Sequence, residues 1–342
     1  MPRDGIRSED PWTAIEACYE NGWTDGLPVV PPTEALVDAC LAAGSWRPDE
    51  VLLDEPNRNR QVSAEKAAIN AVMAGCRPEY FPVVGAALEA MSDPRFGLHG
   101  PATSTGGAAP LVIVNGPIRQ RLAINCKENL LGPGTRANAT IGRALRLVLI
   151  NGLDARPGVL DKSTQGWPGK YTLCFGEDEE SSPWDPLHVS RGFDAGQSTV
   201  TLFAAESGHN LLNHASNSAE GVLVTVADAM AALGSFSRGR SVVVLAPEHA
   251  RHVRTDGWSR KQTQEFLYQN ARRTLAELKR GGKIEGDAEL RPEDEATWVH
   301  RGTGPDDILV LVGGGDAGGH SAFFPSWSRG RGVDFVSREI RA

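Results

Sequence analysis

The sequence lacks paired cysteine motifs, long apolar runs and an excess of basic residues. Its five cysteines are widely spaced and form no Cys-x-x-Cys pair, so we expect free thiols in a reducing compartment. No apolar run approaches the roughly 20 residues of a membrane span, and the first residues, Met1–Gly5, carry no apolar signal region. The formal net charge of −8 argues against a general nucleic-acid binder. The sequence therefore predicts a cytoplasmic protein that binds neither nucleic acid nor membrane.

Motifs for nucleotide, hydrolase and metal chemistry are also missing. The chain has no Walker A loop and no Gly-x-Ser-x-Gly elbow. His249 and His252 lie three residues apart, and His209 and His214 lie five apart, but neither pair forms a recognised closed set of metal ligands. We therefore expect no metal and no cofactor.

Short apolar runs alternating with longer apolar or amphipathic stretches predict an α/β fold of mixed sheets with flanking helices. The expected elements include helices over residues 64–74 and 259–280, strands over residues 241–245 and 308–312, and a loop over residues 44–61. Two similar strand–glycine sequences, Val114-Asn115-Gly116 and Val312-Gly313-Gly314, suggest two related halves. We place the first half, with a helical start and an Asn/Gly-rich loop, at residues 1–155. The second half, with a long initial loop, takes residues 156–342.

The most informative stretch runs from Leu111 to Gly152, where an apolar strand, a polar loop and an apolar helix follow one another. A helix beginning near Thr135, directly after Gly134, would present free N–H groups and the positive end of its dipole to an anion. The loop and the helix start carry further candidate ligands for a polar substrate: Asn115, Asn125, Asn129, Arg136, Asn138 and Arg143. The alternative is that the glycines only shape a turn and that Arg143 pairs with a structural carboxylate.

Other candidates lie outside this stretch. Lys66 and Asn70 form a polar stripe on an otherwise apolar helix, and Lys170 begins an expected strand. His99 lies in a Gly/Pro loop rich in hydroxyl groups and could exchange a proton, although a loop histidine bonded to backbone is the alternative. Glu177 begins an acidic run between two tryptophans, where it could act as a general base or bind an ammonium group. The alternative is that this acidic run is only solvated surface.

Several of these motifs resemble bacterial proteins associated with the UGSC-motif (seleno)protein family. The similarity covers roughly residues 15–185 and is carried by four segments: Asn21–Thr33, Ala67–Tyr80, Val114–Pro117 and Gly132–Arg143. The chain contains no Cys-Gly-Ser-Cys, the cysteine form of that motif, so the resemblance implies a separate small protein subunit in a heteromeric complex. The chain also resembles the large subunit of two-protein aziridine synthases of azinomycin-type antibiotic biosynthesis. That resemblance implies aziridine closure by internal amine attack with sulfate elimination, on a substrate bound to a carrier protein.

The first hypothesis is therefore a cofactor-independent lyase. The helix start at Gly132–Thr140, Arg136 and Arg143 would bind the anionic leaving group, and the asparagines would orient the substrate. Glu177 or His99 would take the proton. Two alternatives remain: a thiol-dependent reductase subunit with a reactive Cys126 or Cys76, partnering a UGSC-type protein, and a non-catalytic scaffold subunit.

Overall fold

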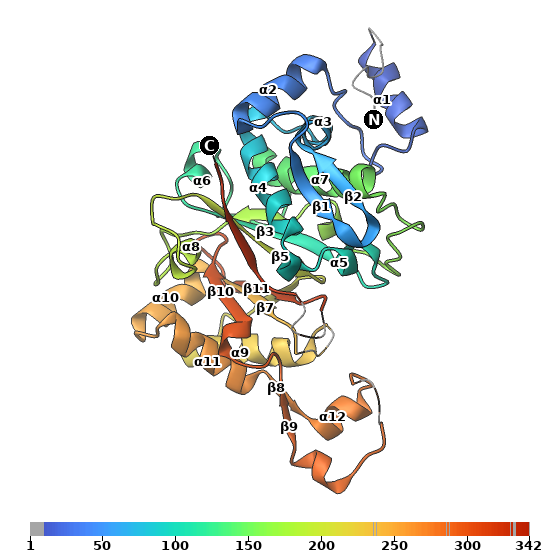
Figure 1. Ribbon diagram of the computed structural model, residues 1–342. Helices are drawn as coiled ribbons and strands as arrows, with labels where there is room; N and C mark the ends of the chain where they lie inside the picture. Colours follow the sequence, from blue (N-terminus) through green and yellow to red (C-terminus); the bar gives the residue numbers. More distant parts are fainter. Residues whose placement is uncertain are drawn as a thin grey trace.

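The computed structural model describes residues 10–341 except 235, 237, 285, 287, 329, 331 and 332. Two four-stranded sheets pack face to face at its centre, and helices cover the outer face of each sheet (Figure 1). The predicted α/β fold with mixed sheets and flanking helices is confirmed. Among the described residues, none of the helices combines the length and apolar character needed to cross a membrane.

The two central sheets have the same strand pattern. In each sheet one parallel pair is followed by two strands that add antiparallel. The first sheet has the order β12 (Val336–Glu339), β5 (Thr199–Ala205), β3 (Ala109–Asn115) and β4 (Cys174–Gly176). The second has the order β10 (Ile308–Val312), β7 (Ser241–Leu245), β11 (His320–Pro325) and β6 (His209–Leu212).

The sheets also exchange their last strands. β6 follows β5 along the chain but pairs in the second sheet, and β12 follows β11 but pairs in the first. The relation between two halves that the sequence suggests stays a prediction. A boundary at residue 155 does not agree with the sheets, because β4, β5 and β12 all follow that residue and yet complete the sheet that contains β3.

Successive side chains of a central strand point to opposite faces of its sheet, so each strand contributes to an outer and an inner core layer. In β3, Val112 and Val114 face the outer helices, whereas Leu111 and Ile113 face the second sheet. This follows from the period of two residues in a β-strand, which turns successive side chains to opposite faces.

Helices cover both outer faces. On the first sheet these are α4 (Phe81–Ser92) and α7 (Arg136–Leu153), and α2 (Glu34–Gly44) and α3 (Ala64–Ala74) pack outside them. On the second they are α9 (Ala219–Ala232), α10 (Pro247–Thr255) and α11 (Arg260–Asn270). The bounds of α3 match the prediction because the Ser63 hydroxyl caps its first turn and Gly75, with φ of 91°, ends it.

The remaining elements are short or peripheral. They are α1 (Pro11–Glu20), α5 (His99–Thr103), α6 (Ile118–Arg121), α8 (Leu187–Ser190), and the single-turn 3₁₀ helices at 56–58, 78–80, 94–96, 168–170, 292–295 and 305–307. A hairpin of β1 (Val51–Glu55) and β2 (Arg60–Ser63) forms where we expected a loop.

A small projection extends from the second half (Figure 1). It comprises β8 (Arg272–Thr274), α12 (Leu275–Arg280) and β9 (Trp298–His300). The single helix expected over residues 259–280 is therefore wrong. The chain leaves α11 after Asn270 because β8 pairs with β9, and Thr274 then caps a new helix.

Candidate functional site

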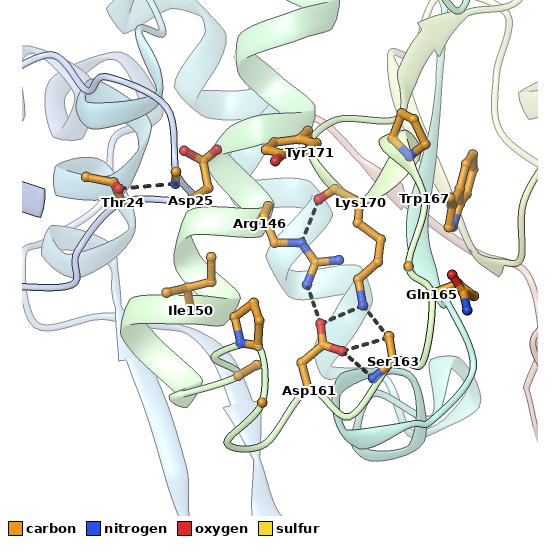
Figure 2. Close-up of a pocket in the computed structure, with 16 residues that line it drawn as sticks. Thr24, Asp25, Arg146, Ile150, Asp161, Ser163, Gln165, Trp167, Lys170 and Tyr171 are labelled. Carbon is orange, nitrogen blue, oxygen red and sulfur yellow. Dashed lines mark hydrogen bonds and ion pairs between the residues drawn. The ribbon is translucent and has the colours of Figure 1, made fainter.

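A pocket of about 680 Å³ opens between the segment at Thr24–Gly26, the helix α7 and the irregular chain at 155–171. Figure 2 shows charged and aromatic side chains from these three segments converging on it. The lining residues that matter below are Asp25, Arg146, Asp161, Ser163, Trp167 and Lys170.

Arg146 supplies a buried positive charge to the pocket wall. It projects from the apolar part of α7 and is only 8% exposed. Its Nε donates to the Lys170 carbonyl at 2.7 Å, and its Nη1 lies 3.6 Å from Asp161 Oδ2. Within the described part of the chain, Nη2 has no hydrogen-bond partner. Burial lowers the pKa of Arg146, and the charge of Asp161 opposes that shift.

Asp161 accepts hydrogen bonds from two neighbouring polar side chains. Its Oδ2 accepts from Lys170 Nζ at 2.5 Å, and its Oδ1 accepts from the Ser163 hydroxyl at 2.7 Å. Lys170 Nζ also lies 2.5 Å from Ser163 Oγ. Burial raises the pKa of Asp161, but the hydrogen bonds from Lys170 and Ser163 outweigh it and leave the pKa below its ordinary value. The pKa of Lys170 is lowered, first by burial and also by the charge of Arg146.

Aromatic rings complete the walls of the pocket. The Trp167 indole N–H donates to the Gly107 carbonyl at 2.5 Å, which fixes the ring, and the half-exposed Tyr171 also lines the pocket. The pocket thus offers a flat apolar wall next to two cations, Arg146 and Lys170, and two carboxylates, Asp161 and the Asp25 that pairs with Arg143. This is the arrangement expected of a site for a small molecule with an anionic group.

A second polar cluster, which we call the acidic centre, lies where β3 and β4 end. It consists of Asn115, Arg119, Glu177, Glu179 and His188. Asn115 Nδ2 donates to Glu177 Oε2 at 2.6 Å and to Glu179 Oε1 at 2.9 Å. Arg119 pairs with Glu179 Oε2 at 2.9 Å. In α/β proteins ligands bind preferentially beyond the carboxyl ends of parallel strands.

The Glu177 side chain is fully buried in the acidic centre. Burial raises its pKa to about 7, against the opposing effects of the Leu187 backbone N–H, the charge of Arg260 and the Asn115 amide. Such a carboxyl group can exchange a proton near neutral pH. Lys170 precedes β4 and Glu177 directly follows it, so the pocket and the acidic centre lie toward opposite ends of this strand.

Arg143 does not reach the pocket. Its Nε and Nη2 donate to the two carboxylate oxygens of Asp25 at 2.8 and 2.7 Å, and Nη2 also contacts the carbonyls of Leu27 and Pro28. The structure therefore realises the alternative in which Arg143 pairs with a structural carboxylate. Arg136 Nε likewise donates to a backbone carbonyl, that of Gly75, at 3.0 Å.

The Asn/Gly loop is tied to its own backbone. Asn125 N–H donates to Asn138 Oδ1, Asn138 Nδ2 donates to the Asn125 carbonyl, and Asn129 Nδ2 donates to the Pro133 carbonyl. Gly134 is exposed with φ of 125°, a conformation that favours glycine. The geometry favours the interpretation of this loop as a shaped turn over that of an anion site.

The other candidates are dispersed. Lys66 is exposed, and Asn70 donates to the Lys66 carbonyl and accepts from Asn151. His99 is half exposed, with Nδ1 3.6 Å from Glu55 Oε1, and is not among the residues that line the pocket. Of the predicted residues, the structure brings Asn115 to Glu177 and places Lys170 in the pocket.

Sequence reasoning missed Arg146, Asp161 and Ser163 in the pocket, and Arg119, Glu179 and His188 in the acidic centre. Only Arg146 carried a signal, because it interrupts the apolar run from Ala144 to Ile150. A buried arginine requires a partner.

The cysteines are all free. Burial raises the pKa of Cys126, against the charge of Arg119, and raises that of Cys76 to about 12. Neither thiol is therefore activated as a nucleophile.

Among the described residues, one group of three side chains, Cys126, Asp178 and Glu180, brings metal-ligating atoms within 4.8 Å of one another. Lys127 already pairs with Asp178, and Arg119 with Glu180, each at 2.9 Å. Comparison with known protein families, with curated proteins and with solved structures gave no match.

Proposed function

We propose that this chain is a small-molecule lyase whose substrate binds in the pocket at Arg146 and Lys170. One observation carries the proposal: a buried guanidinium lines a cavity and keeps Nη2 without a protein partner within the described residues. Desolvated N–H donors aimed at a site where negative charge develops are among the strongest contributions to catalysis. Arg146 thus takes the role that the sequence suggested for Arg143.

The proposed reaction is internal attack of a substrate amine on a carbon that carries a sulfate ester. A carbon–nitrogen bond forms, the carbon–oxygen bond to sulfate breaks, and sulfate leaves with the bonding electrons. The ammonium proton passes to water. Lys170, held in place by Asp161 and Ser163, keeps its positive charge beside the departing anion.

This scheme gives Glu177 and His99 no direct part in the chemistry, because neither lines the pocket. The sulfate leaving group, the carrier-bound substrate and the small partner subunit are proposed on the sequence resemblance. The pocket independently supports an anionic group on a small molecule.

The test measures sulfate release from a β-amino sulfate ester, using protein purified with any partner that accompanies it. Arg146→Met should lower kcat/KM by about 100-fold or more, the loss typical of removing one charge-stabilising donor. Arg156→Met is the matched control, since Arg156 is exposed, pairs with Asp154 at 2.9 Å and is not among the residues that line the pocket. Unchanged sulfate release by folded Arg146→Met protein would refute the proposal.

A parallel experiment follows binding alone. Inorganic sulfate should bind the wild-type protein and the Arg156→Met control equally, and bind the Arg146→Met variant more weakly. Equal binding by all three proteins would show that Arg146 is not an anion ligand.

A further inference from the structure

The indole ring of Trp167 is held in a fixed position in the wall of the pocket. Its N–H donates to the Gly107 carbonyl, and the ring packs against the apolar layer between the two central sheets. Trp167 is nevertheless only partly buried, and its side chain lines the cavity (Figure 2). The pocket therefore presents a flat apolar surface to the molecule that it binds.

Two glycines make room for this ring. A Cβ atom on Gly169 would collide with the six-membered ring of the indole, and a Cβ atom on Gly107 would lie 3.2 Å from its Cδ1. Neither glycine has a positive φ, so the backbone does not require glycine at either position. Gly169 even lies within the 3₁₀ helix at 168–170, where glycine is unfavourable. Both glycines are thus explained by the space that the indole ring occupies.

The two cations of the pocket are tied to the same turn as this ring. The Lys170 backbone N–H donates to the Trp167 carbonyl at 3.0 Å, which closes the turn. Arg146 Nε in turn donates to the Lys170 carbonyl at 2.7 Å. The indole, the ammonium group and the guanidinium therefore belong to one connected wall, and all three line a cavity of about 680 Å³, the size of a small-molecule site.

The other apolar residues of the lining are aliphatic. Ile150 lies one turn after Arg146 on α7, Ala155 and Pro157 follow the end of that helix, and Pro168 adjoins Trp167. These side chains alone would suffice to cover an aliphatic ligand. The indole adds a π-system, on which an aromatic ring gains more than the burial of its area. The presence of the indole thus favours an aromatic ligand.

We propose that the substrate of this pocket carries an aromatic ring close to its anionic group, with the ring stacked on Trp167 and the anion at Arg146 and Lys170. Trp167 then determines specificity and takes no part in bond making. This inference rests on the proposed function, because it takes the anion to bind at Arg146 and Lys170. It narrows the substrate class to sulfate esters with an aromatic substituent.

The experiment compares two probes with the same anionic group, benzenesulfonate and cyclohexanesulfonate, by isothermal titration calorimetry. The wild-type protein should bind benzenesulfonate about two- to tenfold more tightly, which is the gain typical of an aromatic pair beyond its buried area. Trp167→Leu should remove this difference. Trp12→Leu is the matched control and should keep the difference, because Trp12 is exposed and is not among the residues that line the pocket.

A second variant guards against poor folding of Trp167→Leu. Gly169→Ala keeps the indole but adds a Cβ atom where the ring lies, so it should displace the ring and reduce the preference for benzenesulfonate. Arg146→Met should weaken the binding of both probes by the same factor, because it removes the partner of the anion and not that of the ring.

The outcomes separate this inference from the proposed function. Equal binding of the two probes by wild-type protein would overturn the stacking on Trp167, as would a preference that persists in both Trp167→Leu and Gly169→Ala. Either result, with weakened binding of both probes by Arg146→Met, would leave the proposed anion site in place. Unweakened binding by folded Arg146→Met protein would instead contradict the proposed function and this inference with it.

Discussion

Replacing Arg143 with methionine distinguishes a structural arginine from an anion-binding one. Arg143 makes two hydrogen bonds to the Asp25 carboxylate and two to backbone carbonyls of the adjoining segment. The Asp25 side chain is only 3% exposed and that of Arg143 15%. Methionine therefore leaves a nearly buried carboxylate without its cation. Removing one partner of a buried pair lowers the free energy of unfolding by roughly 3–5 kcal/mol. Because Arg143 is partly exposed, we expect a loss of about 3 kcal/mol, at the lower end of this range.

The assay is urea unfolding of the wild type, the Arg143→Met variant, the Asp25→Asn variant and the double variant. The double variant should lose less stability than Arg143→Met alone, because it leaves no uncompensated charge. Inorganic sulfate binding should persist in the double variant, which leaves no unpaired charge at the edge of the pocket. A loss of less than about 1 kcal/mol in Arg143→Met, together with abolished sulfate binding, would refute this reasoning and restore Arg143 as an anion ligand.

Three further predictions concern the thiols, the acid stability and the domain boundary. Cys126 should react with iodoacetamide at neutral pH more slowly than a free thiol, because its pKa is raised; rapid labelling with loss of activity would favour the thiol-dependent alternative. The guanidinium of Arg95 holds the pKa of Asp93 well below its ordinary value of 3.8, so this contribution to stability is present above that value and is lost as the pH falls below it. In thermal melts, Asp93→Asn should reduce the fall of the melting temperature as the pH drops below that value. An unchanged fall would contradict this role of Asp93. A fragment of residues 1–155 should show no cooperative unfolding, because β4, β5 and β12 are missing from its sheet; a cooperative transition would show that the half folds alone.

The elements that were predictable from sequence are those fixed by local signals. α3 has a serine cap and a terminal glycine, β10 is wholly apolar and β7 is apolar after Ser241, so their predicted bounds agree with the structure. The hairpin β1–β2 consists of two short strands interrupted by charged residues, and the break after α11 depends on pairing with β9, which follows much later in the chain. Such elements form through tertiary contacts that local patterns do not contain.

At the candidate site, too, local sequence patterns do not reveal the tertiary contacts, even within the single helix α7. Arg143 and Arg146 lie three residues apart on α7, so their side chains diverge by roughly 60° around the axis. That rotation turns Arg143 toward Asp25, which comes from far earlier in the chain, and turns Arg146 toward Asp161, which comes from the loop that follows. The sequence shows two arginines on an apolar helix and cannot show which carboxylate each one meets. Arg143 uses its donors on the protein itself, whereas Arg146 keeps Nη2 without a partner among the described residues at the wall of a cavity. The arginine that can bind a ligand is therefore Arg146, because its guanidinium keeps a donor that is available to a ligand in the cavity.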